Sequence, residues 1–253
     1  MDLAEAYSIL ETAKAAGYTT YWISNQQKYG AWDTPIAEIA STADHEVWLN
    51  RNVGEQITTG VYDEKLAEVI PPIQPGENAL IMIHLMGCHG SYRERYPLSF
   101  QAFTGGISRI DEYDNSVLYN DFVLRQIYNT VKTLPDFQAF IYFSDHGEDV
   151  VHNAGHESTK FSWPMARIPF IVHVSDLFTH TNPVTVQAMK CHQDAYWTND
   201  LLYDFLLDLL GIQGTSSPAA LDIASDAYLQ DQNGVKTLHG KKMIVHEKSS
   251  ICP

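Results

Sequence analysis

The feature that most constrains the fold is an apolar run that ends directly in a cluster of polar side chains. Residues 139–143 read Ala-Phe-Ile-Tyr-Phe, and a short run rich in aromatic and β-branched residues is typical of a strand buried on both faces of a sheet. The segment Ser-Asp-His-Gly-Glu follows at 144–148. In open α/β sheets, ligands bind beyond the carboxyl ends of the strands. This stretch therefore predicts an α/β domain with a candidate site at Asp145 and His146.

Asp145 and His146 carry side chains that divalent metals bind. A carboxylate oxygen and a neutral imidazole nitrogen, adjacent on one turn, can reach the same ion. The competing interpretation is an ordinary turn with a surface histidine, and the short motif alone favours neither. Two further histidines follow, His152 and His156. Both fall near the candidate site, although a lone loop histidine is more often simply solvated.

A second buried strand is predicted at residues 78–85, Asn-Ala-Leu-Ile-Met-Ile-His-Leu. Its own histidine, His84, alternates with apolar residues and is expected to be a packed core residue. A glycine-flanked turn with His89 comes next, followed by Arg93 and Arg95. A planar guanidinium suits phosphate or sulfate oxygens. We expect Arg93 to pair with surface carboxylates and assign Arg95 to the candidate site.

The remaining elements alternate in a way that predicts a mostly parallel central sheet sandwiched by helices. Helical spacing and flanking glycine or proline predict helices over residues 2–16, 63–69, 110–134 and 199–210, and aromatic and β-branched runs predict strands over 18–24, 46–49, 167–174 and 242–246. Parallel strands bring their carboxyl ends to one edge, so His89 and His156 are expected to converge with Asp145. We interpret residues 1–253 as a single domain with a core at 1–211 and a polar tail at 212–253, the linker-like segment being 213–218.

Charge and hydropathy exclude two classes of protein. The formal net charge is −15, which argues against nucleic acid as a partner because phosphate binding needs a basic face. No run approaches the roughly 20 apolar residues that span a bilayer, and the first residues lack a signal-peptide pattern. The chain as given is therefore expected to be soluble.

A set of short segments, in a fixed order, carries a resemblance to a known family. They are Tyr-Trp-Ile-Ser-Asn-Gln at 21–26, His89 with Arg-Tyr-Pro at 95–97, Tyr-Asp-Asn-Ser at 113–116, Ser-Asp-His-Gly-Glu at 144–148, Gly-His at 155–156, Arg-Ile-Pro-Phe at 167–170 and Thr-Asn-Asp-Leu-Leu-Tyr at 198–203. Over residues 17–211 the chain resembles the soluble domain of the bacterial phosphoethanolamine transferases, in the sulfatase branch of the alkaline phosphatase superfamily. The resemblance implies the periplasmic domain of an inner-membrane enzyme.

The resemblance also implies an activity and a set of site residues. The activity is metal-dependent transfer of phosphoethanolamine from a phospholipid donor to a lipid A or glycan acceptor, as in lipopolysaccharide modification, through a phosphothreonine intermediate. Zinc is the implied metal, with manganese or calcium as alternatives, and Asp145 and His146 are its implied ligands together with an acidic residue and the threonine. His89, His156 and Arg95 are implied to bind substrate or a second metal, with His152 as the alternative to His156.

The sequence departs from the family pattern before the strand at 18–24. The nucleophile and first acidic ligand should precede this strand by tens of residues, but Thr12 falls in a predicted helix and Thr19 and Thr20 begin the strand. The five-helix membrane anchor of the family is missing as well. We therefore expect an N-terminally truncated fragment with an incomplete sheet, its nucleophile upstream of Met1, and little activity alone.

Two other functions remain open at the level of sequence. One is a sulfatase or a phosphoglycerol transferase of the same superfamily. Sulfatases need a Cys/Ser-x-Pro-x-Arg segment, which is absent, but the region that would hold it is absent too. The other is a non-catalytic binding domain that keeps the fold without the nucleophile.

Overall fold

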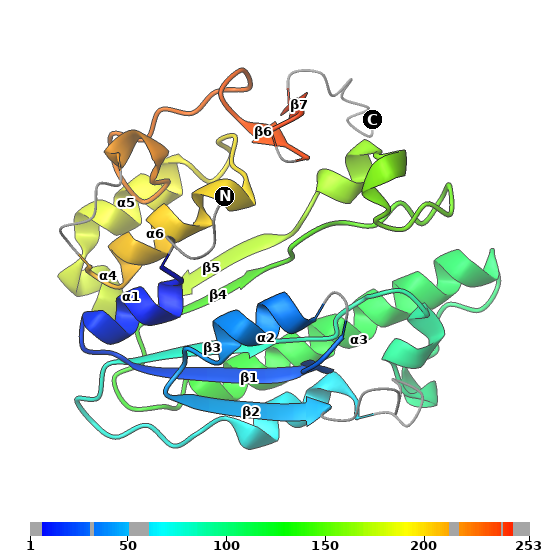
Figure 1. Cartoon of the computed structure of the whole chain (residues 1–253), viewed down its shortest axis with the longest axis horizontal. Coiled ribbons are helices and arrows are strands. Elements are labelled where there is room, and N and C mark those ends of the chain that lie inside the picture. Colours follow the sequence, from blue (N-terminus) through cyan, green and yellow to red (C-terminus); the bar gives the residue numbers. More distant parts are fainter. Residues whose placement is uncertain (1–6, 31–32, 51–60, 213–217, 239, 245–253) are drawn as a thin grey trace. The chain divides into compact units, whose positions relative to one another are not determined.

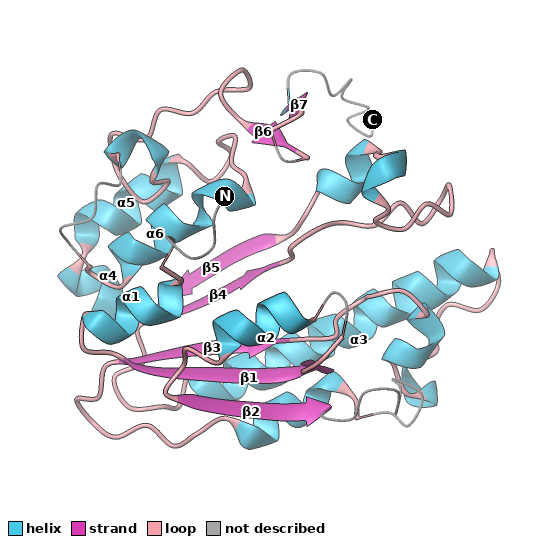
Figure 2. Ribbon diagram, viewed as in Figure 1, coloured by secondary structure: helices cyan, strands magenta, loops and turns pink. Residues whose placement is uncertain are grey.

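The computed structural model describes residues 7–30, 33–50, 61–212, 218–238 and 240–244 (Figure 1). The chain divides into two compact units, Met1–Phe137 and Gln138–Pro253. The single-domain interpretation of residues 1–253 stays a prediction. Figure 2 shows that both units combine helices with strands. The expected α/β class, with a parallel sheet flanked by helices, is confirmed.

The first unit is built on a three-stranded parallel sheet. Strand β1 (Thr19–Gln27) lies between β2 (His45–Asn50) and β3 (Ala79–His84). It runs parallel to both, with Tyr21 opposite His45 on one side and Ile81 on the other. Residues 22–25 of β1 are buried, as expected of a central strand covered on both faces. The strands predicted at 18–24, 46–49 and 78–85 are thus confirmed.

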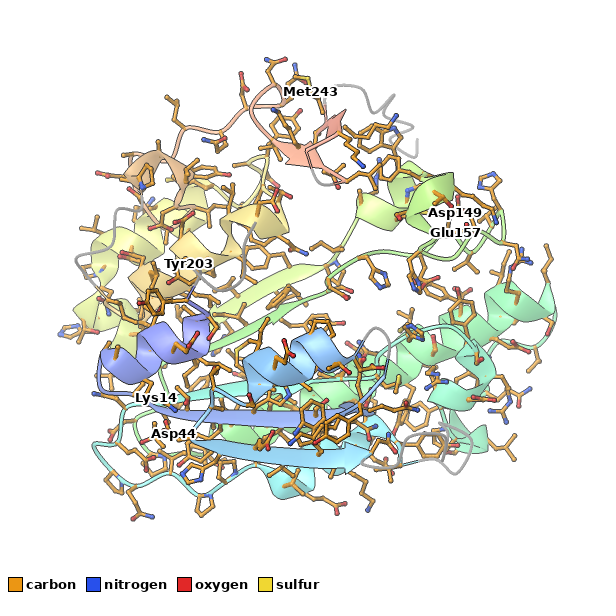
Figure 3. All side chains as sticks on the ribbon, viewed as in Figure 1. Lys14, Asp44, Asp149, Glu157, Tyr203 and Met243 are labelled. Atoms are coloured by element: carbon orange, nitrogen blue, oxygen red, sulfur yellow. The ribbon has the colours of Figure 1, made fainter. Side chains whose placement is uncertain are left out.

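Two helices cover one face of this sheet. Helix α1 (Ile9–Ala15) and helix α2 (Thr34–Ala40) contribute Leu10, Ala37 and Ala40 to a core with Trp22 and Trp48. Helix α1 begins at a capping box, in which the Ser8 hydroxyl accepts from the Glu11 amide and Glu11 accepts from the Ser8 amide. Its last turn is held by an ion pair of 3.0 Å between Lys14 and Asp44 (Figure 3). The predicted helix over 2–16 is confirmed only from Ile9 to Ala15, because Ser8 is its N-cap, while α2 was not predicted.

Helix α3 (Ser108–Val131) packs with the 3₁₀ helix η2 (Asp63–Val69) and contacts η3 (Tyr92–Arg95) and η4 (Leu98–Phe100). Asn115, buried in α3, fixes the preceding segment, because its side chain accepts from the amides of Ala102 and Phe103 and donates to the Phe103 carbonyl. The helices predicted at 110–134 and 63–69 are confirmed, the second as a 3₁₀ helix. Among the described residues, no helix has the length and apolar character needed to cross a bilayer.

The second unit contains a two-stranded antiparallel pair, β4 (Ala139–Phe143) and β5 (Phe170–Val174), with Ile141 opposite Val172. The connection between them holds only η5 (Ser158–Lys160) and η6 (Trp163–Ala166). Since a parallel pair needs a long crossover, usually a helix, this irregular connection agrees with antiparallel pairing. The direction differs from the mostly parallel sheet expected from the sequence. Strand β5 starts directly after Pro169, whose nitrogen cannot donate to a ladder.

Helices and short strands complete the second unit. They are α4 (Asp176–Thr181), α5 (Pro183–Cys191), η7 (Asn199–Leu201), α6 (Leu202–Leu209), η8 (Ala219–Leu221), β6 (Lys236–Thr237) and β7 (Lys242–Met243). The helix predicted at 199–210 is confirmed as η7 followed by α6, whereas α4 and α5 were not predicted. The strand predicted at 242–246 is confirmed only as β7, since Ile244 lies outside the strand and residues 245–246 lie outside the described part. Residues 213–217 of the expected linker also lie outside the described part.

Candidate functional site

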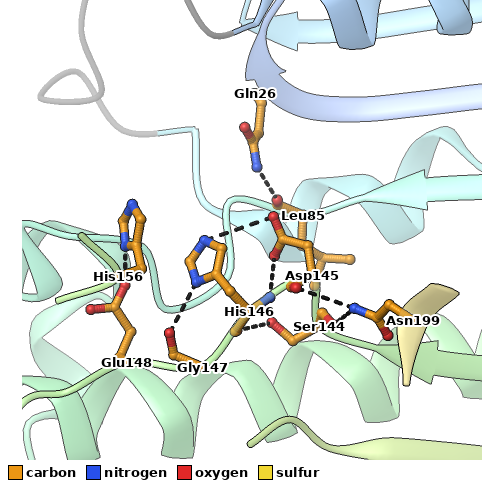
Figure 4. A network of polar contacts seen from close by, with 9 residues as sticks. All are labelled: Gln26, Leu85, Ser144, Asp145, His146, Gly147, Glu148, His156 and Asn199. Atoms are coloured by element: carbon orange, nitrogen blue, oxygen red, sulfur yellow. Dashed lines mark hydrogen bonds and ion pairs between the residues drawn. The ribbon is translucent and has the colours of Figure 1, made fainter. Parts of the chain in front are cut away.

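The turn after β4 is held by hydrogen bonds from within the second unit (Figure 4). The Asn199 side-chain amide donates to the carbonyls of Ser144 and Asp145, at 3.0 and 3.1 Å. The Ser144 hydroxyl donates to the carbonyl of His146 at 2.7 Å. Gly147 donates to Met165, and a Cβ at this position would collide with the carbonyl of Pro164. The turn therefore needs a glycine at 147 and is fixed against η6 and η7.

Asp145 and His146 present their side chains on the same side of this turn. Oδ2 of Asp145 lies 3.7 Å from Nε2 of His146. Nδ1 of His146 lies 3.1 Å from the Gly147 carbonyl; because a carbonyl can only accept, this contact favours the tautomer with the proton on Nδ1. The Asp145 side chain is 84% exposed. The structure thus brings together the two side chains that the sequence nominated first.

His156 joins His146 through ring stacking. The two imidazole centroids lie 4.2 Å apart with an angle of 24° between the rings. Nδ1 of His156 is 2.6 Å from Oε1 of Glu148. Ligand-type atoms of His146, Glu148 and His156 all lie within 4.8 Å of one another, a grouping that could hold a metal ion. Glu148 belongs to the Ser-Asp-His-Gly-Glu segment but was not nominated from the sequence.

His152 has a different partner from His156. Its Nδ1 lies 2.9 Å from Oδ1 of Asp149, a buried carboxylate that also accepts from Ser162 at 2.6 Å. The hydrogen bond from Ser162 is the main cause that lowers the pKa of Asp149 below its ordinary value, with His152 adding to it. Within the described residues, the group of side chains that could hold a metal ion contains His156 and not His152. This favours His156 as the site residue.

His89 and Arg95 lie in the first unit, so their convergence with Asp145 and His156 stays a prediction. His89 is exposed on the turn after β3. That turn is held by Asp63, whose carboxylate accepts from the amides of Met86 and Gly87 at 3.0 and 2.8 Å. Burial raises the pKa of Asp63, against these hydrogen bonds, which lower it.

Arg95 is buried, with a side chain only 5% exposed that reaches Glu94 at 3.3 Å. Its Nε has no hydrogen-bond partner in the described structure, and burial lowers its pKa. It lines a small pocket that also includes Asn25, Asn50, Tyr62, Asp63 and Met86. Arg93 places its guanidinium 4.9 Å from the centre of the Tyr96 ring and donates to the Tyr96 carbonyl at 3.2 Å. The expected carboxylate partner is not found among the described residues.

Three other side chains considered from the sequence have structural partners. Nδ1 of His84 lies 3.2 Å from the Ser24 hydroxyl and its ring packs 5.4 Å from Trp22, as expected of a packed residue. The Thr12 hydroxyl donates to the Ser8 carbonyl at 3.0 Å. The Thr20 hydroxyl is buried and donates to Asp44 at 2.9 Å. Thr12 and Thr20 are therefore engaged in stabilising α1 and β1.

Comparison with known proteins places the chain in context. A family model described as Sulfatase matches residues 4–212. The chain is 29% identical over 198 residues to phosphoethanolamine transferase EptC of Escherichia coli K12, covering 70% of this chain and 33% of that protein. It is 32% identical over 152 residues to EptA of Helicobacter pylori, covering 53% of this chain and 29% of that protein. The chain thus spans about a third of the length of these relatives.

Solved structures show the same fold. The C-terminal periplasmic domain of E. coli EptC, in complex with zinc, superposes with a TM-score of 0.78 at 25% identity, covering 91% of this chain and 69% of that one. The integral membrane protein EptA of Neisseria meningitidis superposes with a TM-score of 0.67 at 20% identity, covering 85% of this chain and 43% of that one. The predicted resemblance to phosphoethanolamine transferases is therefore confirmed.

Proposed function

The chain belongs to the sulfatase family, and on that premise we propose that it forms part of a metal-dependent phosphoethanolamine transferase. The proposed reaction moves phosphoethanolamine from a phospholipid to a lipid A or glycan acceptor through a phosphothreonine. The relatives named above support the transferred group. The periplasmic relatives support a location on the periplasmic side of the bacterial inner membrane.

The observation that carries the proposal is the geometry of Asp145 and His146. In a tetrahedral zinc site with bonds of about 2.0–2.2 Å, neighbouring ligand atoms lie roughly 3.4 Å apart. The separation of 3.7 Å between Oδ2 of Asp145 and Nε2 of His146 is close to this value. A mixed carboxylate and imidazole pair suits zinc better than calcium, which prefers oxygen ligands alone. These residues therefore fit a divalent metal, and zinc is the metal proposed.

Each candidate residue has a proposed part in the reaction. Zinc, when bound, supplies Lewis acidity at the phosphoryl group and at the attacking hydroxyl. Asp145 and His146 hold the ion, and Asn199 keeps their turn in place through two hydrogen bonds. His89, His156 and Arg95 are proposed to bind the phosphate oxygens or a second metal. No threonine of this chain is assigned as the nucleophile.

Metal binding by the 253-residue chain tests the proposal. Calorimetric titration with zinc should show a site that weakens at least tenfold in Asp145→Ala and His146→Ala, because each removes one proposed ligand. His152→Ala is the matched control, since this imidazole bonds the Asp149 carboxylate in the same loop and is 76% exposed. Unchanged affinity in both ligand variants would refute the assignment.

The zinc-loaded chain should also discriminate among headgroups. Glycerophosphoethanolamine is expected to bind more tightly than glycerophosphoglycerol or an aryl sulfate. Preference for either of the latter would favour a phosphoglycerol transferase or a sulfatase. Zinc-independent binding of any of them would favour a non-catalytic domain.

A further inference from the structure

We propose that Glu148 is a positioning residue for His156. Its carboxylate holds the Nδ1 proton of the imidazole and thereby directs the Nε2 lone pair into the site beside His146. The effect on metal or phosphate binding rests on the function proposed above, whereas the effect on the His156 ring does not. In this proposal Glu148 hydrogen-bonds to the imidazole and does not itself bind the metal.

The short contact between Glu148 and His156 shows whether Glu148 positions the imidazole or binds a metal together with it. Oε1 of Glu148 and Nδ1 of His156 lie 2.6 Å apart, slightly shorter than the ~2.7–2.9 Å of a charge-assisted N–H···O hydrogen bond. Two ligands of one tetrahedral zinc would lie about 3.4 Å apart. A separation of 2.6 Å therefore leaves room for a proton between these two atoms and not for a metal ion. His156 can bind an ion or a phosphate only through Nε2.

Burial fixes the carboxylate while the imidazole stays accessible. The Glu148 side chain is 7% exposed and that of His156 is 38% exposed. An antiparallel bridge between Asp149 and Gly155 closes the intervening loop, with a hydrogen bond of 2.7 Å from the Asp149 amide to the Gly155 carbonyl. Residues 148 and 156 flank this bridge on either strand, so their side chains meet.

The bridge also explains the glycine at 155. Gly155 has a φ of +56°, a conformation that side chains with a Cβ rarely adopt. The position its Cβ would take lies 3.4 Å from Oε2 of Glu148. The glycine backbone thus borders the second carboxylate oxygen and helps to keep the acid in the interior of the loop.

The consequence for His156 concerns its tautomer. A neutral imidazole has one N–H donor and one acceptor nitrogen, and the partner of one nitrogen decides the state of the other. Glu148 fixes the proton on Nδ1 of His156, and the Gly147 carbonyl favours it on Nδ1 of His146. Figure 4 shows the two Nδ1 atoms directed toward these acceptors and the two Nε2 atoms on the opposite side. Glu148 therefore aligns His156 with His146 as a second acceptor.

The tautomer can be measured on the metal-free chain by two-bond ¹H–¹⁵N correlation of ¹⁵N-histidine-labelled protein. The spectrum is taken at about pH 8, above the ordinary histidine pKa of about 6.5, and the His156 signals are assigned by their absence in His156→Gln. The proton should be on Nδ1 in the wild type. It should remain there in Glu148→Gln, whose amide oxygen can still accept, and should move to Nε2 in Glu148→Ala. A wild-type ring with the proton on Nε2 would overturn the proposal without any variant being needed.

Zinc titration provides the second readout. Loss of a hydrogen-bond partner of a metal ligand typically weakens metal binding about 10–100-fold. The zinc affinity of Glu148→Ala should fall by this factor, and that of Glu148→Gln should lie between those of Glu148→Ala and the wild type. His152→Ala should leave both the His156 signals and the affinity unchanged. A wild-type chain with the expected tautomer but no zinc binding would refute the proposed function and not the positioning role. Loss of the Nδ1 proton of His156 on zinc binding would show that zinc displaces the proton shared with Glu148, and would overturn the positioning role.

Discussion

Replacing Asp222 by asparagine is expected to stabilise the second unit at neutral pH. Asp222 is buried, and burial, followed by the nearby charges of Asp208 and Asp204, raises its pKa to about 6, against an amide hydrogen bond from Ala224 and the neighbouring His192, which lower it. The amide of Ala224 donates to Oδ1 of Asp222 at 2.9 Å, a contact that the asparagine oxygen can keep. The substitution removes a buried charge and leaves its best hydrogen bond in place.

The magnitude follows from the difference in proton binding between the folded and unfolded states. In the unfolded state the aspartate keeps its ordinary pKa of 3.8, and in the folded state its pKa is about 6, so the two differ by about 2. Each unit corresponds to about 1.4 kcal/mol, so ionised Asp222 costs about 3 kcal/mol above pH 6. Between pH 4 and 6 the folded state binds the extra proton, and stability falls as pH rises. Below pH 4 both states are protonated and the cost vanishes.

Urea unfolding of wild type and Asp222→Asn should therefore differ by about 3 kcal/mol at pH 7 and by little at pH 4. Asp226→Asn is the matched control, because Asp226 is exposed nearby in sequence and its removal changes the net charge equally. Equal stabilisation by both variants would mean that relief of general repulsion, given the net charge of −15, explains the effect. A destabilised Asp222→Asn at pH 7 would refute the reasoning.

Three further outcomes are expected. Asn199→Ala removes both hydrogen bonds to the carbonyls of Ser144 and Asp145, so zinc affinity measured by calorimetry should fall about tenfold. An unchanged affinity would show that the turn keeps its conformation without Asn199. A hydrogen bond from the Thr20 amide is the main cause that lowers the pKa of Asp44 to about 2. The contribution of ionised Asp44 to folding stability should therefore be present above pH 4 and lost as pH falls toward 2. In Asp44→Asn, the free energy of unfolding should depend less on pH over this range. The zinc-supplied chain should transfer little phosphoethanolamine from a phosphatidylethanolamine analogue, since no threonine is assigned as nucleophile; robust turnover with a phosphorylated Thr or Ser detected by mass spectrometry would contradict this.

The elements that the sequence revealed are those with a strong local signal. Strand β4 was predicted with its observed bounds because turn residues limit an unbroken apolar run on both sides. Its antiparallel pairing with β5 could not be read from the same residues, because periodicity reports burial and not strand direction. Helices α4 and α5 are short, and short helices depend on tertiary packing more than on their own pattern. The Ser175 cap and the proline at 183 were the available signals.

In the candidate site, too, the residues that could be predicted are adjacent in sequence, and those that could not have partners far along the chain. Asp145 and His146 are adjacent, so the sequence was sufficient to nominate them. Glu148 was not nominated, because glutamates are rarely buried unless paired and its partner lies beyond a loop. Asn199 acts on the turn from a different segment. Neither role follows from composition or spacing.

The choice between His152 and His156 depends on the register of one loop. Both imidazoles bond a carboxylate that is nearly inaccessible, Asp149 at 2% and Glu148 at 7% exposure, so the hydrogen bond alone does not distinguish a site residue from a structural one. The difference is that His152 is 76% exposed at the loop tip, whereas His156 stacks on His146. The Asp149–Gly155 bridge sets this arrangement. A shift of that bridge by one residue would turn His156 away from His146, because adjacent residues of a strand point to opposite faces.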